Sequence, residues 1–184
     1  FSDLQHAKQV LREIKLLRHF DHENLMALRS LYFHRQDIYL VMDRMDCDLQ
    51  TIISDPSPQA RLTPKHIRWL LFQIVNGVKA LHEAGVIHRD LKAGNLLVDK
   101  NCSLKISDFG LSRGYSDSNS QMTEYVTSRW FRAPEVILKP GRYGKEIDMW
   151  SIGCILSEMV RRKPLFPGNS TEHQVESIVT VLGV

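Results

Sequence analysis

Residues 86–99 read VIHRDLKAGNLLVD, and no other stretch constrains the fold as closely. The stretch begins and ends with apolar residues, which are typical of short buried strands. Its middle holds charged and polar side chains that a buried strand does not normally carry. These side chains are His88, Arg89, Asp90, Lys92 and Asn95. The pattern therefore indicates a polar loop that is held between two short strands.

Asp90, Lys92 and Asn95 are candidates for a shared chemical task. A carboxylate can accept a proton from a hydroxyl nucleophile, an ammonium can neutralise a transferring phosphoryl group, and an amide oxygen can bind Mg²⁺. For any single one of these residues, a salt-bridged turn is the simpler interpretation. The full pattern H-R-D-L-x-x-x-N arises by chance less than about once per million positions at average residue usage. Chance therefore does not explain the whole pattern.

Two short apolar segments after this loop predict a small hairpin. They read LLV at 96–98 and LKI at 104–106, and the turn sequence DKNCS separates them. Pairing Leu97 with Ile106 would place Asn95 opposite Asp108, just beyond the open end of the hairpin. Two oxygen ligands that are distant in the sequence would then lie side by side.

Periodicity predicts the neighbouring elements. Apolar residues at helical spacing predict a helix over about residues 4–18, with Glu13 at the edge of its apolar stripe. The run DIYLVMD at 37–43 predicts a buried strand. Thr63, followed by proline, predicts the start of a long helix that Gly85 ends.

Two later segments complete the expected architecture. Residues 110–127 are polar and rich in turn formers, which is typical of a mobile loop. Residues 146–160, EIDMWSIGCILSEMV, are apolar nearly all round and predict a helix that is buried on most sides. An early strand and helix followed by a helix-rich remainder indicate an α+β fold.

The composition is that of an ordinary globular protein, with 184 residues of which 43% are hydrophobic and 24% charged. A net charge of +3 is too small to indicate nucleic-acid binding. Three cysteines without CxxC spacing (Cys47, Cys102 and Cys154) are expected to be reduced thiols in an intracellular protein.

No stretch has the ~18 apolar residues of a membrane span, and no signal-peptide pattern opens the chain. Because the first residue is Phe1 and not Met, and Val184 follows Leu-Gly in mid-pattern, we expect an internal piece of a longer product.

Two more motifs follow the loop. Asp108-Phe109-Gly110 is weak alone, because Asp-x-Gly is a common turn, but it lies at the end of the predicted hairpin. RAPE at 132–135 alone could be a helix start with proline at its first position. In this order, the three motifs match the signature set of protein kinases.

The sequences HRDLKAGN, SDFG, RAPE and DMWSIGC resemble the eukaryotic protein kinase family. LREIKLLRHFDHENL, DFGLSRGYS and MTEYVTSRW resemble its mitogen-activated subgroup, specifically the extracellular-signal-regulated type with a Thr-Glu-Tyr activation motif. The resemblance covers essentially the whole chain and implies a truncated two-lobed, protein-kinase-like α+β fold. Residues 1–42 would be part of the N-lobe, 43–48 the hinge and 49–184 part of the C-lobe, with the activation segment at 108–135.

The resemblance also implies catalytic roles. Asp90 would be the catalytic base that orients the substrate hydroxyl, and Lys92 would contact the γ-phosphate. Asn95 and Asp108 would hold Mg²⁺. Glu13 would pair with a strand lysine that steadies the phosphates of ATP.

Further residues would bind the rest of ATP. These are Met42 at the back of the adenine pocket, Asp43 and Met45 at the adenine edge through their backbone, Asp48 at the ribose, and Leu97 beneath the ring. Asp148 would anchor the catalytic loop from the buried helix. From the residues alone, an acid that complements a helix N-terminus is nearly as good an interpretation of Asp148.

Thr123 and Tyr125 would be the activating phosphorylation sites. Two hydroxyls in an exposed loop mean little alone, but the resemblance assigns arginines to each phosphate. Arg12, Arg89 and Arg113 would gather around the phosphothreonine, and Arg129 and Arg132 would receive the phosphotyrosine. A phosphate can order a loop that arginine repulsion would otherwise leave loose.

Four positions depart from the family's usual residues. Ala93 stands where proline is usual, so the catalytic loop is expected to be slightly less rigid. Ser128 replaces a threonine but keeps the hydroxyl. Phe131 replaces a tyrosine and loses a hydrogen bond worth roughly 1 kcal/mol. Thr127 replaces an alanine and can narrow the substrate pocket.

The implied function is that of a proline-directed serine/threonine protein kinase of the mitogen-activated type in a signalling cascade, with ATP as co-substrate and Mg²⁺ as cofactor. Implied partners are protein substrates with Ser/Thr-Pro sites, an upstream dual-specificity kinase and phosphatases, without nucleic acid or membrane. The expected location is the cytoplasm and nucleus. Residues 1–184 alone are expected to be inactive, because the glycine-rich loop and the strand lysine would precede them.

Two other functions remain open from the sequence. One is a catalytically weak scaffold or pseudokinase, against which the intact Asp90, Lys92, Asn95 and Asp108 argue. The other is a cyclin-dependent-type kinase, which would lack the Thr-Glu-Tyr triplet at 123–125.

Overall fold

The computed structural model describes residues 4–114, 129–138 and 143–183. The helices are α1 (Leu4–His19), α2 (Leu49–Ser54), α3 (Pro64–Glu83), α4 (Pro134–Leu138), α5 (Glu146–Arg161) and α6 (Thr171–Leu182), with short 3-10 helices η1 (Pro58–Ala60), η2 (Ala93–Asn95) and η4 (Arg129–Phe131). The strands are β1 (Leu28–His34), β2 (Asp37–Met42), β3 (Cys47–Asp48), β4 (Val86–Ile87), β5 (Leu96–Val98), β6 (Leu104–Ile106) and β7 (Arg113–Gly114). None of the described helices combines the length and hydropathy needed to cross a membrane.

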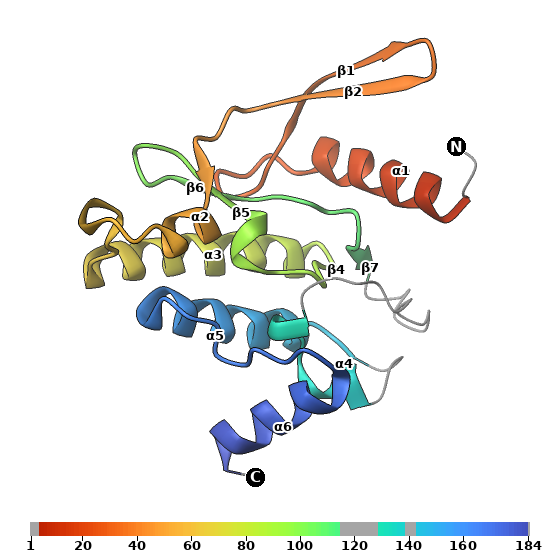
Figure 1. Cartoon of the computed structure of the whole chain (residues 1–184). Helices are drawn as coiled ribbons and strands as arrows, with labels where there is room; N and C mark the ends of the chain where they lie inside the picture. The colour runs from red at the N-terminus through yellow and green to blue at the C-terminus, as the bar shows by residue number, and fades with distance from the viewer. Residues whose placement is uncertain (1–3, 115–128, 139–142, 184) are drawn as a thin grey trace.

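The elements are stacked from one end of the molecule to the other (Figure 1). α1 and the β1–β2 hairpin lie at the end near the N-terminus, and α4 and α6 lie at the end near the C-terminus. α3 runs through the middle, where it packs against β6 on one side and α5 on the other. This α+β arrangement confirms the expected fold class.

Local sequence explains the limits of α3. The Thr63 hydroxyl accepts a hydrogen bond from the His66 N–H, and the His66 ring accepts one from the Thr63 N–H, both at 3.3 Å. Gly85 follows the helix with φ of +73°, a conformation that glycine adopts without strain. Between these ends, one face of the helix is buried and includes Leu70, Ile74, Val78 and Leu81.

α5 is buried on most sides, as its apolar sequence predicts. Its buried side chains include Ile152, Ile155 and Met159 in the main core and Ile147 in a second, smaller cluster. The helix ends at Arg162, whose φ of +57° turns the chain away. The Arg162 guanidinium then donates hydrogen bonds to the carbonyls of Ile52, Asp55 and Ala60, and so ties the end of α5 to α2.

The N-terminal helix forms where predicted, but the strand prediction was partly wrong. β2 lies at the predicted position and pairs in antiparallel fashion with β1, a strand that periodicity did not reveal. β2 is not buried, because Tyr39, Val41 and Met42 are 40–50% exposed. Within the described residues this sheet has only two strands, so no third strand covers its edge. An apolar run in the sequence predicts a strand, whereas the burial of that strand depends on which other elements pack against it.

The hairpin of β5 and β6 forms, but the predicted register was wrong by one residue. Leu96 pairs with Ile106 and Leu97 with Lys105, instead of Leu97 with Ile106. Ser107, not Asp108, therefore stands opposite Asn95, and the Ser107 N–H donates to the Asn95 carbonyl at 2.9 Å. The observed register points Leu104 and Ile106 into the core, where both have no exposed surface.

The predicted mobile loop at 110–127 contains a short strand within its described part. Arg113 and Gly114 form β7 and pair with Ile87 and Val86 of β4. The pairing fixes this segment beside the catalytic loop, because β4 leads directly into that loop. The rest of the predicted loop, from residue 115, lies outside the described residues.

Candidate active site

The loop at 88–92 is anchored from behind by Asp148 of α5. Asp148 has no exposed surface, and its Oδ2 and Oδ1 accept hydrogen bonds from the backbone N–H groups of His88 and Arg89, both at 2.9 Å. Arg89 has φ of +74°, which is uncommon for a residue with a side chain. Two charge-assisted hydrogen bonds hold this turn. The anchoring role that the resemblance implied for Asp148 is therefore confirmed.

His82 provides a third contact to Asp148 that sequence reasoning missed. Its Nε2 lies 2.8 Å from Asp148 Oδ2. His82 stands in the last turn of α3, and its carbonyl accepts a hydrogen bond from the Lys145 ammonium, just before α5 begins. The buried carboxylate thus joins α3, α5 and the loop. Only an acid within the apolar sequence of this helix hints at this contact.

The ring of His88 connects the loop to the Asp108-Phe109-Gly110 segment. Nδ1 accepts a hydrogen bond from the Asp90 N–H at 3.3 Å, which leaves the proton on Nε2, 3.0 Å from the Ser107 carbonyl. The same ring packs against the buried ring of Phe109, with centroids 5.6 Å apart. The histidine is therefore a structural link and is fully buried.

The three residues that sequence analysis grouped together meet in the structure. The Lys92 ammonium lies 2.9 Å from Asp90 Oδ2. The Asn95 side-chain amide donates to the Asp90 carbonyl at 2.9 Å and to Asp90 Oδ2 at 3.2 Å. Both side-chain contacts use Oδ2, and among the described contacts Oδ1 has none. Asp90 thus presents one carboxylate oxygen that can accept a proton from a substrate hydroxyl.

Asn95 and Asp108 are brought to the same end of the hairpin. The Ser107 hydroxyl and N–H both donate to the Asn95 carbonyl, and Asp108 follows with φ of +64° and an exposed side chain. Because the Asn95 NH₂ group faces Asp90, its amide oxygen is the atom that can ligate a cation. The described residues contain no cluster of three or more His, Cys, Asp or Glu that could hold a metal alone.

Glu13 of α1 lies close to this end of the hairpin. Burial, and then the nearby Asp108 carboxylate, raise the pKa of Glu13. The preceding Arg12 donates a hydrogen bond to the Gly110 carbonyl at 3.3 Å, so α1 contacts the segment that contains Asp108. Two neighbouring carboxylates and an amide oxygen make an environment that favours a hard cation. The residues therefore fit Mg²⁺, which proteins bind through one or two carboxylates together with substrate phosphates.

The residues between β2 and α2 are held by charge pairs and caps. Asp43 accepts a bidentate pair of hydrogen bonds from Arg29 of β1, at 2.7 and 3.0 Å, and its Oδ2 lies 3.7 Å from the Lys105 ammonium. These contacts, with Arg29 the largest cause, lower the pKa of Asp43. The Asp43 side chain thus fixes the segment that leaves β2, while its backbone remains the predicted adenine contact.

The other predicted nucleotide contacts surround this segment. Met42 ends β2 and is 40% exposed, whereas Met45 and Leu97 pack against the main core. Asp48 caps α2, because its carboxylate accepts hydrogen bonds from the Thr51 N–H at 2.8 Å and the Thr51 hydroxyl at 2.9 Å. Its predicted contact with a ribose would have to share these oxygens, and it stays a prediction.

Three of the predicted phosphate-binding arginines come together from three distant segments. Burial lowers the pKa of Arg89, and the charges of Arg113 and Arg12 lower it further, so both residues lie near enough to act on the Arg89 charge. The pairing of Arg113 with Ile87, and the bond from Arg12 to the Gly110 carbonyl, bring their segments beside the loop that carries Arg89. Arg132 lines a small cavity with Asp90, and Arg129 donates to the Asn169 carbonyl at 3.4 Å. Thr123 and Tyr125, together with Thr127 and Ser128, lie outside the described residues.

The other two departures from the family pattern lie in the described structure. Ala93 is fully buried and opens η2, so a methyl group fills a position with no room for solvent. Phe131 is buried in η4, and its carbonyl accepts a hydrogen bond from the Ser151 hydroxyl at 2.8 Å. The backbone of Phe131 is therefore tied to α5 without help from its side chain.

Comparison with known proteins agrees with this geometry. Mitogen-activated protein kinase 4 of Oryza sativa subsp. japonica is 50% identical to the chain, mitogen-activated protein kinase 3 of Arabidopsis thaliana 47%, and mitogen-activated protein kinase homolog 1 of Petunia hybrida 46%. Each alignment covers 100% of this chain and 48–50% of the relative. The chain thus spans about half the length of the curated relatives it matches.

The family model described as the protein kinase domain matches residues 2–182. The match includes the anchored loop, the Asp90–Lys92–Asn95 cluster and the helix that carries Asp148. The chain therefore belongs to the protein kinase domain family.

Proposed function

We propose that the full-length protein is a proline-directed serine/threonine protein kinase of the mitogen-activated type. The observation that carries this proposal is the cluster of Asp90, Lys92 and Asn95, with contacts of 2.9–3.2 Å, on a loop that Asp148 anchors. Similarity over the whole chain to relatives named mitogen-activated protein kinases supports the subgroup. A scaffold that only binds partners would not need this arrangement.

The proposed reaction is transfer of the γ-phosphate of ATP to a Ser or Thr hydroxyl. Asp90 Oδ1 orients the hydroxyl and accepts its proton as the new bond to phosphorus forms. Lys92, held beside Asp90 at 2.9 Å, places its positive charge near the transferring phosphoryl group. The bond between the β,γ-bridging oxygen and phosphorus breaks, and ADP leaves with that oxygen.

ATP and Mg²⁺, which protein kinases generally use, would be bound by two sets of residues. Asn95, through its amide oxygen, and Asp108 would hold the cation, which neutralises charge on the phosphates when bound. The backbone of Asp43 and Met45 would bind the adenine edge. The Asp43 side chain, held by Arg29, would keep this backbone in place.

Regulation would come from phosphorylation of Thr123 and Tyr125 by an upstream dual-specificity kinase, with reversal by phosphatases. The effect of the Arg12 and Arg113 charges on Arg89, and the pairing of Arg113 beside the loop that carries Arg89, support a phosphate site, because neighbouring like charges favour an anion. A phosphate there would link α1, the catalytic loop and β7. Phosphotyrosine would bind Arg129 and Arg132.

The preference for proline would arise from the segment that contains Arg132. In the proposed subgroup, a backbone carbonyl of this segment is already engaged by that arginine. A substrate residue with an N–H after the target Ser or Thr would bury an unpaired donor, at a cost of roughly 1–3 kcal/mol. Proline has no N–H and avoids this cost.

One experiment tests both the reaction and the preference. Asp90→Asn in the full-length, phosphorylated protein should lower kcat by about 10²–10⁴-fold, because the general base is lost, while ATP affinity changes little. Phosphate transfer from MgATP is measured on two peptides that differ only in Ser-Pro or Ser-Ala. The Ser-Pro peptide should react about tenfold faster with the unchanged enzyme.

The controls separate the parts of the proposal. Lys100→Ala changes an exposed lysine in the turn between β5 and β6 and should leave the rates unchanged. Equal rates for Asp90→Asn and the unchanged enzyme would refute the catalytic role of Asp90. Equal rates on the two peptides would refute proline direction alone. No transfer by the unchanged enzyme would favour the scaffold function.

A further inference from the structure

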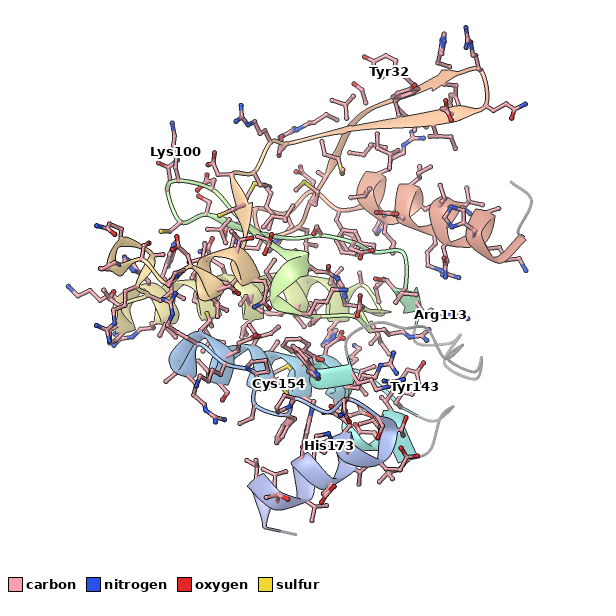
Figure 2. The ribbon with its side chains drawn as sticks, viewed as in Figure 1. Tyr32, Lys100, Arg113, Tyr143, Cys154 and His173 are labelled. Atoms are coloured by element: carbon pink, nitrogen blue, oxygen red, sulfur yellow. The ribbon has the colours of Figure 1, made fainter. Side chains whose placement is uncertain are left out.

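Tyr143 lies against the guanidinium of Arg89. Arg89 Cζ is 5.4 Å from the centroid of the Tyr143 ring. The ring is 7% exposed and belongs to the second core cluster with Ile87, Ala133, Val136 and Ile147. Figure 2 shows Tyr143 and Arg113 at the same edge of the molecule. No sequence pattern singled out this tyrosine.

The position of the charged Arg89 side chain is energetically unfavourable. Its backbone has φ of +74° and is fixed through the bond from its N–H to Asp148. Its Nε is buried and makes no hydrogen bond within the described residues. Burial lowers the pKa of Arg89, and the charges of Arg113 and Arg12 act in the same direction, while Tyr143 opposes them. Without a contact that offsets this cost, the free energy would fall if the Arg89 side chain moved into solvent.

The ring of Tyr143 is suited to offset the cost of burying the Arg89 charge. The face of an aromatic ring carries partial negative charge and attracts a guanidinium, more strongly where water is excluded. Contact through the ring leaves the N–H groups at the edge of the guanidinium available to an anion. The Tyr143 hydroxyl is buried and forms no hydrogen bond of acceptable geometry within the described residues, although its proximity to Arg89 helps to raise the pKa of that residue. The ring face, 5.4 Å from Arg89 Cζ, is the contact whose geometry the structure defines.

We propose that Tyr143 is a positioning residue for the phosphate site, because its ring holds the Arg89 cation in place before any phosphate is bound. The proposal rests on the proposed function, in which Arg89 with Arg12 and Arg113 receives a phosphate. A long side chain that is already ordered loses less conformational entropy when the anion arrives. The ring also links the phosphate site to Ala133 and Val136, which follow directly on the segment that contains Arg132.

The test is the affinity of the unphosphorylated full-length protein for inorganic phosphate. Tyr143→Leu should weaken binding by about tenfold, as expected for loss of a partly desolvated cation–π contact. Tyr143→Phe keeps the ring and should bind within about twofold of the unchanged protein. Arg89→Leu should abolish this binding and so assigns the titration to the site.

A matched control separates positioning from packing. Ile147→Val removes apolar contact from the same cluster but keeps the ring, and should leave phosphate affinity unchanged. If Tyr143→Leu does not fold, Tyr143→Met of similar volume replaces it. Equal or tighter phosphate binding by the variant that lacks the ring would overturn the proposal, because the ring would then be inert or would compete with the anion.

A second measurement reports directly on the surroundings of the Arg89 side chain. In a nitrogen-15 spectrum of arginine side chains, the ring current of Tyr143 should shift the Arg89 Nε–H signal. Tyr143→Phe should keep the shift, and Tyr143→Met or Tyr143→Leu should remove it. An Arg89 signal that does not respond to loss of the ring would also overturn the proposal. If the unchanged protein binds phosphate in this way but transfers none from ATP, only the proposed function fails.

Discussion

Each end of α5 buries a carboxylate, but the two carboxylates differ in their hydrogen-bond partners. Asp148, in the first turn, has no exposed surface and accepts contacts from His82, His88 and Arg89 at 2.8–2.9 Å. Glu158, in the last turn, is 1% exposed, and neither of its oxygens has a hydrogen-bond partner within the described residues. Burial raises the pKa of Glu158, which neighbouring Gln50 offsets only in part.

The comparison shows what a buried charge requires. Two backbone N–H groups and a histidine replace the water that Asp148 loses, and in return the carboxylate fixes the loop that carries Asp90. The Gln50 amide donates to the Ser54 hydroxyl at 3.2 Å, and its effect on the Glu158 carboxylate is smaller than that of burial, so Glu158 receives no comparable compensation. Removal of the first carboxylate should therefore destabilise the protein, whereas neutralisation of the second should stabilise it.

The largest expected effect follows from loss of Asp148. Asp148→Ala in the full-length protein should lower the free energy of unfolding by about 3–5 kcal/mol, because two backbone N–H groups and His82 lose a buried partner. Asp148→Asn keeps one acceptor oxygen and should lose less. Urea unfolding measures the stability, and hydrogen exchange at His88 and Arg89 should accelerate in both variants. Unchanged exchange in Asp148→Ala would show that the loop is held by other contacts.

A smaller effect, of opposite sign, is expected at Glu158. Its pKa is raised above the ordinary value of 4.5 in the folded state. The stability that protonated Glu158 provides is therefore present below pH 4.5 and is lost as pH rises through the folded pKa. Glu158→Gln has no charge to bury, so at pH 7 it should be more stable than the unchanged protein by roughly 1 kcal/mol.

The pH dependence distinguishes this explanation from a general packing effect. Urea midpoints of Glu158→Gln and the unchanged protein should converge near pH 4 and separate as pH rises. Glu172→Gln, at an exposed position in α6, serves as the control and should not show a growing advantage with pH. A constant difference at all pH values would mean that the charge of Glu158 does not matter.

The smallest effect concerns Cys154, which lies one turn before Glu158. Burial, and then the Glu158 charge, raise the pKa of Cys154 to about 12. At pH 8 this thiol should resist iodoacetamide, while the free and partly exposed Cys102 reacts. Mass spectrometry of the alkylated peptides measures both rates. Because burial is the larger cause, Glu158→Gln should leave Cys154 protected, and rapid alkylation in that variant would show that charge dominates.

Much of the candidate site could be predicted because its residues are close together in the sequence. Asp90, Lys92 and Asn95 lie on one short segment, so the contacts among them depend little on the rest of the fold. The His82 contact to Asp148 and the Tyr143 contact to Arg89 could not be predicted in this way. Each joins residues more than fifty positions apart, and neither follows from helical or strand periodicity.

By itself, the sequence determined the limits of α3, the place of the hairpin and the chemical groups of the catalytic loop. Caps, glycines and apolar periodicity act over a few residues, so these features need no knowledge of distant parts. Three features depend on how distant elements pack: Ser107 stands opposite Asn95, β2 is exposed, and Asp148 has hydrogen-bond partners of good geometry where Glu158 has none within the described residues. Burial and hydrogen-bond partners depend on which distant elements pack together, because desolvation is a property of the whole surroundings of a group.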